Sequence, residues 1–213
     1  MQTDKLVKDK WTEHWNNKKN LEESASSLGI FLRKQRIKIL SKMLNNFHRD
    51  LSIIDIGCGG GSILSVFKDL GFKNVTGIDF VEDSMKHCEK LGFIKGKDVF
   101  LMDAKNTKFP DEAFDIVFSE GLWEHFQDPR PYMTEATRIT KKVIVVIQPN
   151  HFSPFGKLMN IGWNLFSQEK GGIKEYSFTL GYFKDFLKLY GFKLTKSKST
   201  ILNEQAIMQF ERR

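Results

Sequence analysis

The sequence predicts an α/β protein with a doubly wound, mostly parallel seven-stranded sheet, an antiparallel C-terminal strand and helices on both faces. Short apolar runs, among them 53–56 and 143–147, alternate with amphipathic stretches of helical period. A glycine-rich segment at 57–61 directly follows the first run. The last two predicted strands, 192–198 and 204–213, are near enough in sequence to pair as an antiparallel hairpin. This hairpin distinguishes the predicted sheet from the wholly parallel sheet usual in dinucleotide-binding folds.

The first strand leads through the glycines into a helix that contains Ile63 and Phe67. A buried strand followed by a tight glycine turn and a helix is the layout of a nucleotide-cofactor site. The second apolar run, 75–79, ends on Asp79, eighteen residues beyond Gly61. A carboxylate at that point can hold both hydroxyls of a ribose. The two signals together predict a ligand that carries an adenosine.

The spacing of the glycines selects among adenosine cofactors. A dinucleotide fingerprint closes on glycine or alanine, but Ser62 occupies that position here. The alternative pattern D-x-G-x-G-x-G fits, and it closely resembles motif I of the class I S-adenosylmethionine (SAM) methyltransferases. In that family the loop passes under the methionine part of the cofactor. The resemblance implies SAM as the cofactor and implies contacts to it from the loop residues Asp55, Gly57, Cys58, Gly59 and Gly61.

The following segments repeat the order of the same family. The segment 80–85 opens a helix with an acid-rich first turn, and 98–102 is predicted to form the third strand. The segment 108–118 is similar to the family's loop into strand four. The resemblance covers about residues 45–150 in register. It implies further cofactor contacts, with an adenine clamp at the Asp-Ala pair, from Asp79, Phe80, Met102, Asp103, Ala104, Ser119 and Glu120.

A helix over 129–139 and a strand over 143–147 complete this part of the predicted sheet. Most relatives carry a Pro-Gly-Gly turn before that strand, whereas here we expect a turn formed by Thr140, Lys141 and Lys142. The turn lies away from the expected cofactor site. The departure therefore bears on the subfamily rather than on activity.

The chain of 213 residues is predicted to form a single domain, because no repeat or proline-rich linker divides it. We expect an N-terminal helical arm or lid at 1–50, with Ile37, Leu40, Leu44 and Phe47 on one helix face. The cofactor-binding core is expected at 51–150, a lid insertion and helix at 151–185, and the C-terminal part of the sheet at 186–213.

The formal net charge of +7 is unevenly distributed along the chain. Residues 1–50 carry 11 basic and 6 acidic side chains, and residues 141–213 carry 12 and 5, whereas residues 51–140 carry 10 and 15. Basic flanks can attract an anionic substrate, a nucleic acid or an anionic membrane. A lysine-rich solvated surface explains the same pattern and is favoured, since residues 151–185 are nearly neutral, with 4 basic and 3 acidic side chains.

The stretch after strand five is rich in aromatic and large apolar residues, and we expect it to cover the substrate. His151, Phe155, Trp163 and Tyr176 are the predicted substrate-binding residues. An apolar lid favours a small hydrophobic or aromatic acceptor. Simple burial of these aromatic residues against the sheet fits the sequence equally well. An amphipathic helix over 158–166 that touches a membrane is a less favoured interpretation.

Methyl transfer from a sulfonium is an in-line displacement, so much of the catalysis can come from orientation. A general base is needed only if the acceptor loses a proton. Glu120, Glu124, His125 and His151 follow strands four and five and are candidates for this role. His125 and His151 are the predicted catalytic residues, although His125 is favoured to orient its own loop. For Trp15 and Arg33 in the arm, a packing or surface role is favoured over a role in closing the pocket.

The predicted function is SAM-dependent methyl transfer to a small, hydrophobic or aromatic acceptor. One alternative is a non-catalytic SAM-binding scaffold, because an intact cofactor site does not establish turnover. The other is a nicotinamide-dependent oxidoreductase, which Ser62 and the Asp103-Ala104 pair disfavour. A nucleic-acid acceptor is disfavoured because Ser119 to Leu122 lack the Pro-Pro motif of amino-methylating enzymes and the chain has no Pro-Cys dipeptide.

The remaining features predict a cytoplasmic protein without a metal. The N-terminus is polar and lacks the pattern of a signal peptide, and no apolar run approaches the ~20 residues that span a bilayer. The two cysteines, Cys58 and Cys88, are expected to be reduced thiols. Neither they nor the five histidines have metal-ligand spacing.

Overall fold

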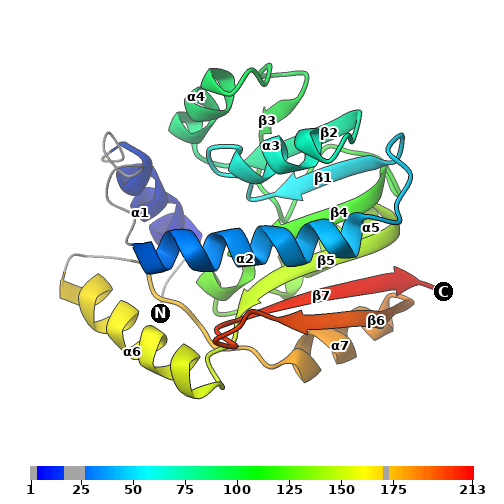
Figure 1. Ribbon diagram of the computed structural model, residues 1–213. Helices are drawn as coiled ribbons and strands as arrows, with labels where there is room; N and C mark the ends of the chain where they lie inside the picture. The colour runs from blue at the N-terminus through cyan, green and yellow to red at the C-terminus, as the bar shows by residue number, and fades with distance from the viewer. Residues whose placement is uncertain (1–3, 17–26, 170–172) are drawn as a thin grey trace.

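A seven-stranded sheet in the order β3-β2-β1-β4-β5-β7-β6 forms the centre of the molecule (Figure 1). The computed structural model describes residues 4–16, 27–169 and 173–213. The strands are β1 Ser52–Ile56, β2 Asn74–Asp79, β3 Val99–Leu101, β4 Phe114–Glu120, β5 Thr140–Pro149, β6 Phe192–Ser199 and β7 Gln205–Arg212.

The first five strands are parallel, and β7 is antiparallel to both of its neighbours, β5 and β6. The antiparallel pairing runs from Val143 opposite Glu211 to Pro149 opposite Gln205. The predicted fold class and the predicted C-terminal hairpin are therefore confirmed.

Helices cover both faces of the sheet and bury two apolar cores. One core packs α2, α3 and α4 against residues such as Ile53 and Val145, and the other packs α5 and α7 against residues such as Ile54 and Val146. Adjacent residues of one strand point to opposite faces, so both cores draw on the same short apolar runs. The helices are α1 Asp4–Asn16, α2 Ser27–Leu44, α3 Ser62–Asp69, α4 Glu82–Lys90, the 3₁₀ helix η2 Trp123–His125, α5 Arg130–Ile139, α6 Pro154–Glu169 and α7 Leu180–Leu189.

The sequence prediction of a turn at Thr140 to Lys142 is wrong. Helix α5 ends at Ile139 and β5 begins at the next residue, with Thr140 opposite Phe114 of β4. The Thr140 hydroxyl donates a hydrogen bond of 2.5 Å to the Ala136 carbonyl oxygen, which satisfies an acceptor of the last helical turn without a separate turn.

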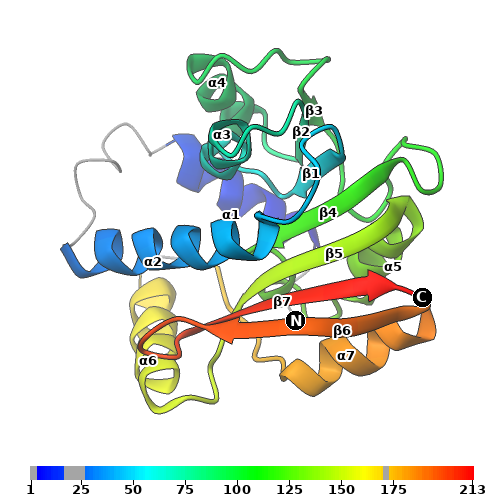
Figure 2. The same cartoon turned by 45° about the vertical axis from the view of Figure 1, so that its right-hand side comes forward.

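Three helical segments gather at one end of the sheet. Figures 1 and 2 both place α1, α6 and the first half of α2 beyond the carboxyl ends of β1, β4 and β5. Ligands bind at the carboxyl ends of the strands in open α/β sheets. These helices are therefore the elements that can cover a ligand there.

Candidate active site

The loop between β1 and α3 is shaped by three glycines in the left-handed region. Gly57, Gly59 and Gly61 have φ angles of 80°, 51° and 79°, which L side chains rarely adopt. The N–H groups of Gly57 and Cys58 both donate to the Ile78 carbonyl oxygen at 2.9 Å, which ties the loop to β2. The side chain of Cys58 packs in the core beside Gly77, so only the backbone of Cys58 can face a ligand in the loop.

The carboxylate of Asp79 connects the loop to the start of α4. One oxygen accepts a hydrogen bond from Gly59 N–H and the other from Val81 N–H, both at 2.9 Å. Burial raises the pKa of Asp79 above its ordinary value, and these hydrogen bonds oppose the shift. Each carboxylate oxygen can accept a second hydrogen bond, so Asp79 retains acceptor capacity for a ligand hydroxyl.

Two buried polar side chains lie at the carboxyl ends of β1 and β4. Asp55 is 3% exposed and Ser119 is fully buried. One oxygen of Asp55 and the Ser119 hydroxyl have no hydrogen-bond partner among the described residues. Burial, together with the nearby Glu120 and Asp79 carboxylates, raises the pKa of Asp55 well above its usual range. Buried groups of this kind are usually satisfied by a partner, so the site suits a polar ligand.

Glu120, at the end of β4, forms an ion pair of 2.9 Å with Arg36 Nε of α2. This pair joins the N-terminal arm to the expected cofactor edge. Arg33, for which the sequence favours a packing or surface role, is exposed. A helix position three residues further on carries the contact, and nothing in the local sequence distinguishes the two arginines.

The residues expected to surround an adenine are arranged after β2 and β3. Met102 N–H donates to the Asp79 carbonyl oxygen at 2.9 Å, which places the two segments side by side. Ala104 is buried, Phe80 and Met102 are half-buried, and Asp103 is exposed. One oxygen of Asp103 accepts from Lys105 N–H at 3.0 Å. Asp103 is therefore accessible to a ligand while its carboxylate is held by its own loop.

Helix α1 lies directly over the glycine loop. A Cβ atom built on Gly59 would be 2.8 Å from Cζ2 of Trp15, so the indole ring is in close contact with the loop. The same ring lies 5.2 Å from the ring of His87 on α4. One turn earlier, Trp11 contacts His125 edge-on at 5.1 Å. The arm thus reaches both the loop and the segment after β4.

Glu124 and His125, in η2, are buried side chains that burial drives toward their neutral forms. Burial, with the nearby Glu175 carboxylate, raises the pKa of Glu124 to about 8. Burial lowers the pKa of His125 to about 4. Nδ1 of His125 and one oxygen of Glu124 have no hydrogen-bond partner in the described part of the chain. At neutral pH these are therefore a carboxylic acid and a neutral imidazole.

His151, just beyond β5, is held by two polar partners from the segment before α7. Its Nδ1 lies 2.9 Å from Ser177 Oγ, and its Nε2 lies 3.3 Å from a carboxylate oxygen of Glu175. The side chain of His151 is 6% exposed. Tyr176, between these partners, donates its N–H to the Glu124 carbonyl oxygen at 2.7 Å. His151 and η2 are thus joined through one segment.

The structure describes the side chain of one predicted lid residue of α6 but not that of the other. Phe155 on α6 is half-buried. The backbone of Trp163 belongs to α6, but its side chain lies outside the described part of the structure. A cavity of about 120 Å³ lies at the end of β5, lined among others by Gln148, Phe178 and Met208. It is smaller than the ~300 Å³ at which ligand pockets begin.

Sequence reasoning missed four residues of this site: Trp11, Arg36, Glu175 and Ser177. Trp11 contacts His125, which is more than a hundred positions away, and Glu175 lies 24 residues from its partner His151. Such pairings depend on how α1 and the segment before α7 return to the sheet. The one available signal was the acid and hydroxyl that flank Tyr176.

Several known proteins that are similar to this chain are named as methyltransferases. The sequence profile described as "Methyltransferase domain" matches residues 54–146. A phosphatidylethanolamine N-methyltransferase of Cereibacter sphaeroides is 30% identical over 139 residues, which cover 63% of this chain and 64% of that protein. The 2-methyl-6-phytyl-1,4-hydroquinone methyltransferase 1 of Oryza sativa subsp. japonica is 29% identical over 60% of this chain and 40% of its own length. The chain thus matches less than two thirds of each of these relatives.

Solved structures share the fold over nearly the whole chain. The magnesium protoporphyrin IX methyltransferase of Synechocystis PCC 6803, solved with bound SAH, has a TM-score of 0.73. It covers 99% of this chain and all of that chain at 16% identity. At this level of sequence identity, the similarity shows a shared fold alone.

Proposed function

We propose that this chain, a member of the class I SAM-dependent methyltransferase family, moves a methyl group from SAM to a small lipophilic acceptor. The observation that carries the proposal is the D-x-G-x-G-x-G loop, held open by positive φ angles and fixed by the Asp79 carboxylate at the carboxyl edge of the sheet.

The residues at this edge fit SAM. Asp79 would accept the ribose hydroxyls, Phe80, Met102, Asp103 and Ala104 would surround the adenine, and Gly57, Gly59 and Gly61 would leave room for the methionine part. Asp55 and Ser119 have acceptor or donor capacity that no described residue uses, and Glu120 completes the edge. Bound SAM supplies a methyl group on a sulfonium. The chain's own residues then bind, orient and exclude water.

The proposed acceptor is lipophilic. The relatives are named for phosphatidylethanolamine, a phytyl hydroquinone and phthiotriol dimycocerosates. In this chain Phe155 of α6 and Tyr176 lie after β5, beside the site edge, and both are half-buried. We propose that they contact the acceptor together with Trp163 and His151.

Where the acceptor must lose a proton, we propose that His151 receives it. Glu175 would hold the Nε2–H of the neutral ring, and Nδ1 would take the acceptor's proton through Ser177 Oγ. The low pKa of His125 makes it a weak base at neutral pH. We therefore assign His125 an orienting role toward Trp11 and the loop after β4.

The proposed function also includes a domain organisation, a class of substrate and a cellular location. We propose that the chain acts as one domain, with 1–50 as the arm, 51–150 as the cofactor core, 151–185 as the lid and 186–213 as the C-terminal part of the sheet. We propose a cytoplasmic protein with a small-molecule substrate and without a nucleic-acid acceptor. Among the described residues, no helix combines the length and the apolar character that crossing a membrane requires.

Two other functions compete with this proposal. A nicotinamide-dependent oxidoreductase is disfavoured by Ser62 and by the antiparallel β7 in the sheet. A non-catalytic SAM-binding scaffold shares the entire cofactor site, so only turnover separates it from an enzyme.

Transfer of labelled methyl groups tests the proposal. Purified protein is incubated with methyl-labelled SAM and a panel of lipophilic acceptors, namely a prenylated hydroquinone, phosphatidylethanolamine and a total lipid extract. We expect label in at least one acceptor, and we expect Asp79→Ala to lower the rate at least about tenfold, the cost of losing charged hydrogen bonds. Asp69→Ala, which changes an exposed acid of α3, should keep the wild-type rate. SAM binding without transfer to any acceptor would favour the scaffold.

A further inference from the structure

Exposed apolar side chains concentrate at the end of the molecule that carries the site. Sixteen large apolar side chains of the described residues are exposed, and nine of them belong to α2, to the segment 152–165 or to the β6–β7 turn. We call these nine the α2–α6 apolar face: Leu28, Ile30, Phe31, Phe152, Leu158, Met159, Ile161, Leu165 and Ile201.

The exposure on α6 follows one side of the helix. Leu158, Ile161 and Leu165 are 66%, 60% and 62% exposed. Their spacing of three and four residues places them on a single helical face. Water-exposed residues of this size in such a row are unfavourable unless a partner covers them.

The β6–β7 turn contacts both α2 and the residues that lead into α6. Ile201 N–H in the β6–β7 turn donates to the Gln35 side chain of α2 at 3.3 Å. In the same turn, the Asn203 side chain accepts a hydrogen bond of 3.0 Å from Asn150, four residues before α6. Both views place α6 and the first half of α2 at the same end of the molecule (Figures 1 and 2). The nine residues therefore lie at one end of the molecule, on segments that the β6–β7 turn links.

The charged side chains on these segments are all basic. Residues 27–44, 150–168 and 193–203 contain no aspartate or glutamate. Basic side chains are exposed on the same segments: Arg33, Lys34, Lys38, Lys42, Lys157 and Lys198. Exposed apolar residues with basic side chains on the same segments complement an anionic lipid surface, which offers apolar chains below a layer of negative headgroups.

We propose that the α2–α6 apolar face docks on the surface of an anionic lipid bilayer. Leu158, Ile161 and Leu165 enter the headgroup and acyl boundary, and the lysines and arginines contact the lipid phosphates. Phe152 of the face directly follows His151 in the chain, so a docked molecule holds the proposed acceptor site near the bilayer. The docking concerns the surface alone and does not depend on turnover, although its use in collecting a lipophilic acceptor rests on the proposed function.

Sedimentation with lipid vesicles tests the docking. The whole protein is mixed with vesicles of phosphatidylcholine alone or of phosphatidylcholine and phosphatidylglycerol in equal parts. We expect binding to the anionic vesicles only, weakened by salt because the charges are exposed. The variant Leu158→Glu/Ile161→Glu/Leu165→Glu should lower the binding at least about tenfold, since three apolar anchors are lost and three negative charges are added.

The control is Leu189→Glu on α7, which changes a side chain that is 80% exposed and lies outside the face. It should bind vesicles as the wild type does, and the melting temperatures of both variants should match that of the wild type. SAM binding, measured in parallel, should be equal in all three proteins, so a failed cofactor site is recognised separately. Three results would overturn the docking: no wild-type binding to anionic vesicles, equal binding by the triple variant, or a dimer in ultracentrifugation that the triple variant dissociates while vesicles are ignored.

Discussion

Glu124 and His125 are adjacent, and burial drives both toward the uncharged form. The pKa of Glu124 is raised to about 8, and that of His125 is lowered to about 4. The folded protein thus resists ionisation of Glu124 at high pH and protonation of His125 at low pH. Because of Glu124, folding stability should fall as pH rises from about 4.5 toward about 8. Because of His125, it should also fall as pH drops from about 6.5 toward about 4.

The Glu124→Gln variant tests this linkage. Glutamine stays neutral, so the variant should lose the decline in stability between pH 4.5 and 8 that Glu124 causes. We expect a gain of about 1–3 kcal/mol over the wild type at pH 8 and little difference near pH 4.5. Urea unfolding across this pH range measures it. Glu89→Gln, at an exposed position of α4, should leave the profile unchanged, and a parallel profile for Glu124→Gln would show that Glu124 does not titrate in this range.

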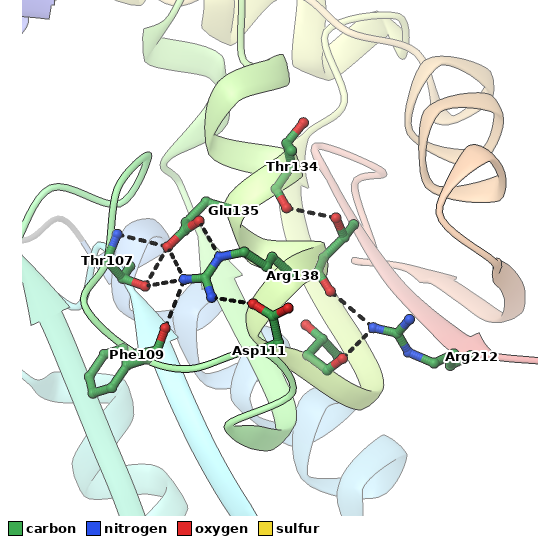
Figure 3. Close-up of polar contacts among 9 residues, drawn as sticks. Thr107, Phe109, Asp111, Thr134, Glu135, Arg138 and Arg212 are labelled. Carbon is green, nitrogen blue, oxygen red and sulfur yellow. Dashed lines mark hydrogen bonds and ion pairs between the residues drawn. The ribbon is translucent and has the colours of Figure 1, made fainter.

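Arg138 connects α5 to the loop before β4 (Figure 3). It donates to both carboxylate oxygens of Glu135 at 2.8 and 2.7 Å, to Asp111 at 2.7 Å and to the Phe109 carbonyl oxygen at 2.9 Å. Glu135 is 9% exposed and also accepts from Thr107 N–H at 2.8 Å. The pair is thus a largely buried, multiply bonded contact, unlike an exposed ion pair.

We expect Arg138→Met to lower the free energy of unfolding by about 2–3 kcal/mol, because it leaves the Glu135 carboxylate buried without its charged partner. The matched control is Arg130→Met on the same helix. Arg130 pairs with Asp128 at 2.7 Å, but its side chain is 64% exposed, so its loss should cost far less than the loss of Arg138. Urea denaturation measures the free energy of unfolding of both variants. Equal decreases in the two variants would contradict this prediction.

At the residue scale, the sequence predicted the positions that lie on a continuous motif. The glycine loop follows β1, and Asp79 ends the neighbouring strand β2. Their separation in the sequence is therefore enough to predict that they meet. Arg36 and Glu175 could not be predicted, because their partners Glu120 and His151 come from other segments. The burial that lowers the pKa of His125 depends likewise on tertiary packing, which includes Trp11 of the arm.

At the element scale, helix α1 carries a tryptophan, Trp15, whose fluorescence should respond to cofactor binding. Trp15 contacts Gly59 and Gly60, on which the methionine part of SAM is proposed to lie. Binding of SAM should therefore change the surroundings of the indole ring and its fluorescence emission. We expect a saturable emission change in the wild type and its loss in Trp15→Phe, while Trp11→Phe keeps it. A change that persists in Trp15→Phe would contradict this position of the arm.

Elements with strong apolar periodicity were predicted with nearly correct bounds, and junctions were not. The hairpin expected at 192–198 and 204–213 is formed by Phe192–Ser199 and Gln205–Arg212. The start of β5 was misplaced because Thr140 to Lys142 are polar and favour a turn locally, while pairing of Thr140 with Phe114 of β4 favours a strand. Tertiary pairing decided the conformation of this junction.

At the scale of the whole molecule, the sheet order places the site at one end of a rigid scaffold. Strands β1, β2 and β4 bring Asp55, Asp79 and Ser119 to the same edge. The arm and α6 cover this edge, and both are additions to the core that residues 54–146 form. In the proposed function the core therefore carries the chemistry, and the additions determine acceptor choice and surface contacts.

Calorimetric titration of the folded protein with SAM, S-adenosylhomocysteine and NADH tests the central claim most directly. The account predicts micromolar binding of both SAM and S-adenosylhomocysteine, no heat with NADH, and loss of binding in Asp79→Ala but not in Asp69→Ala. Binding of NADH alone, or the absence of binding by all three ligands in a folded protein, would contradict it.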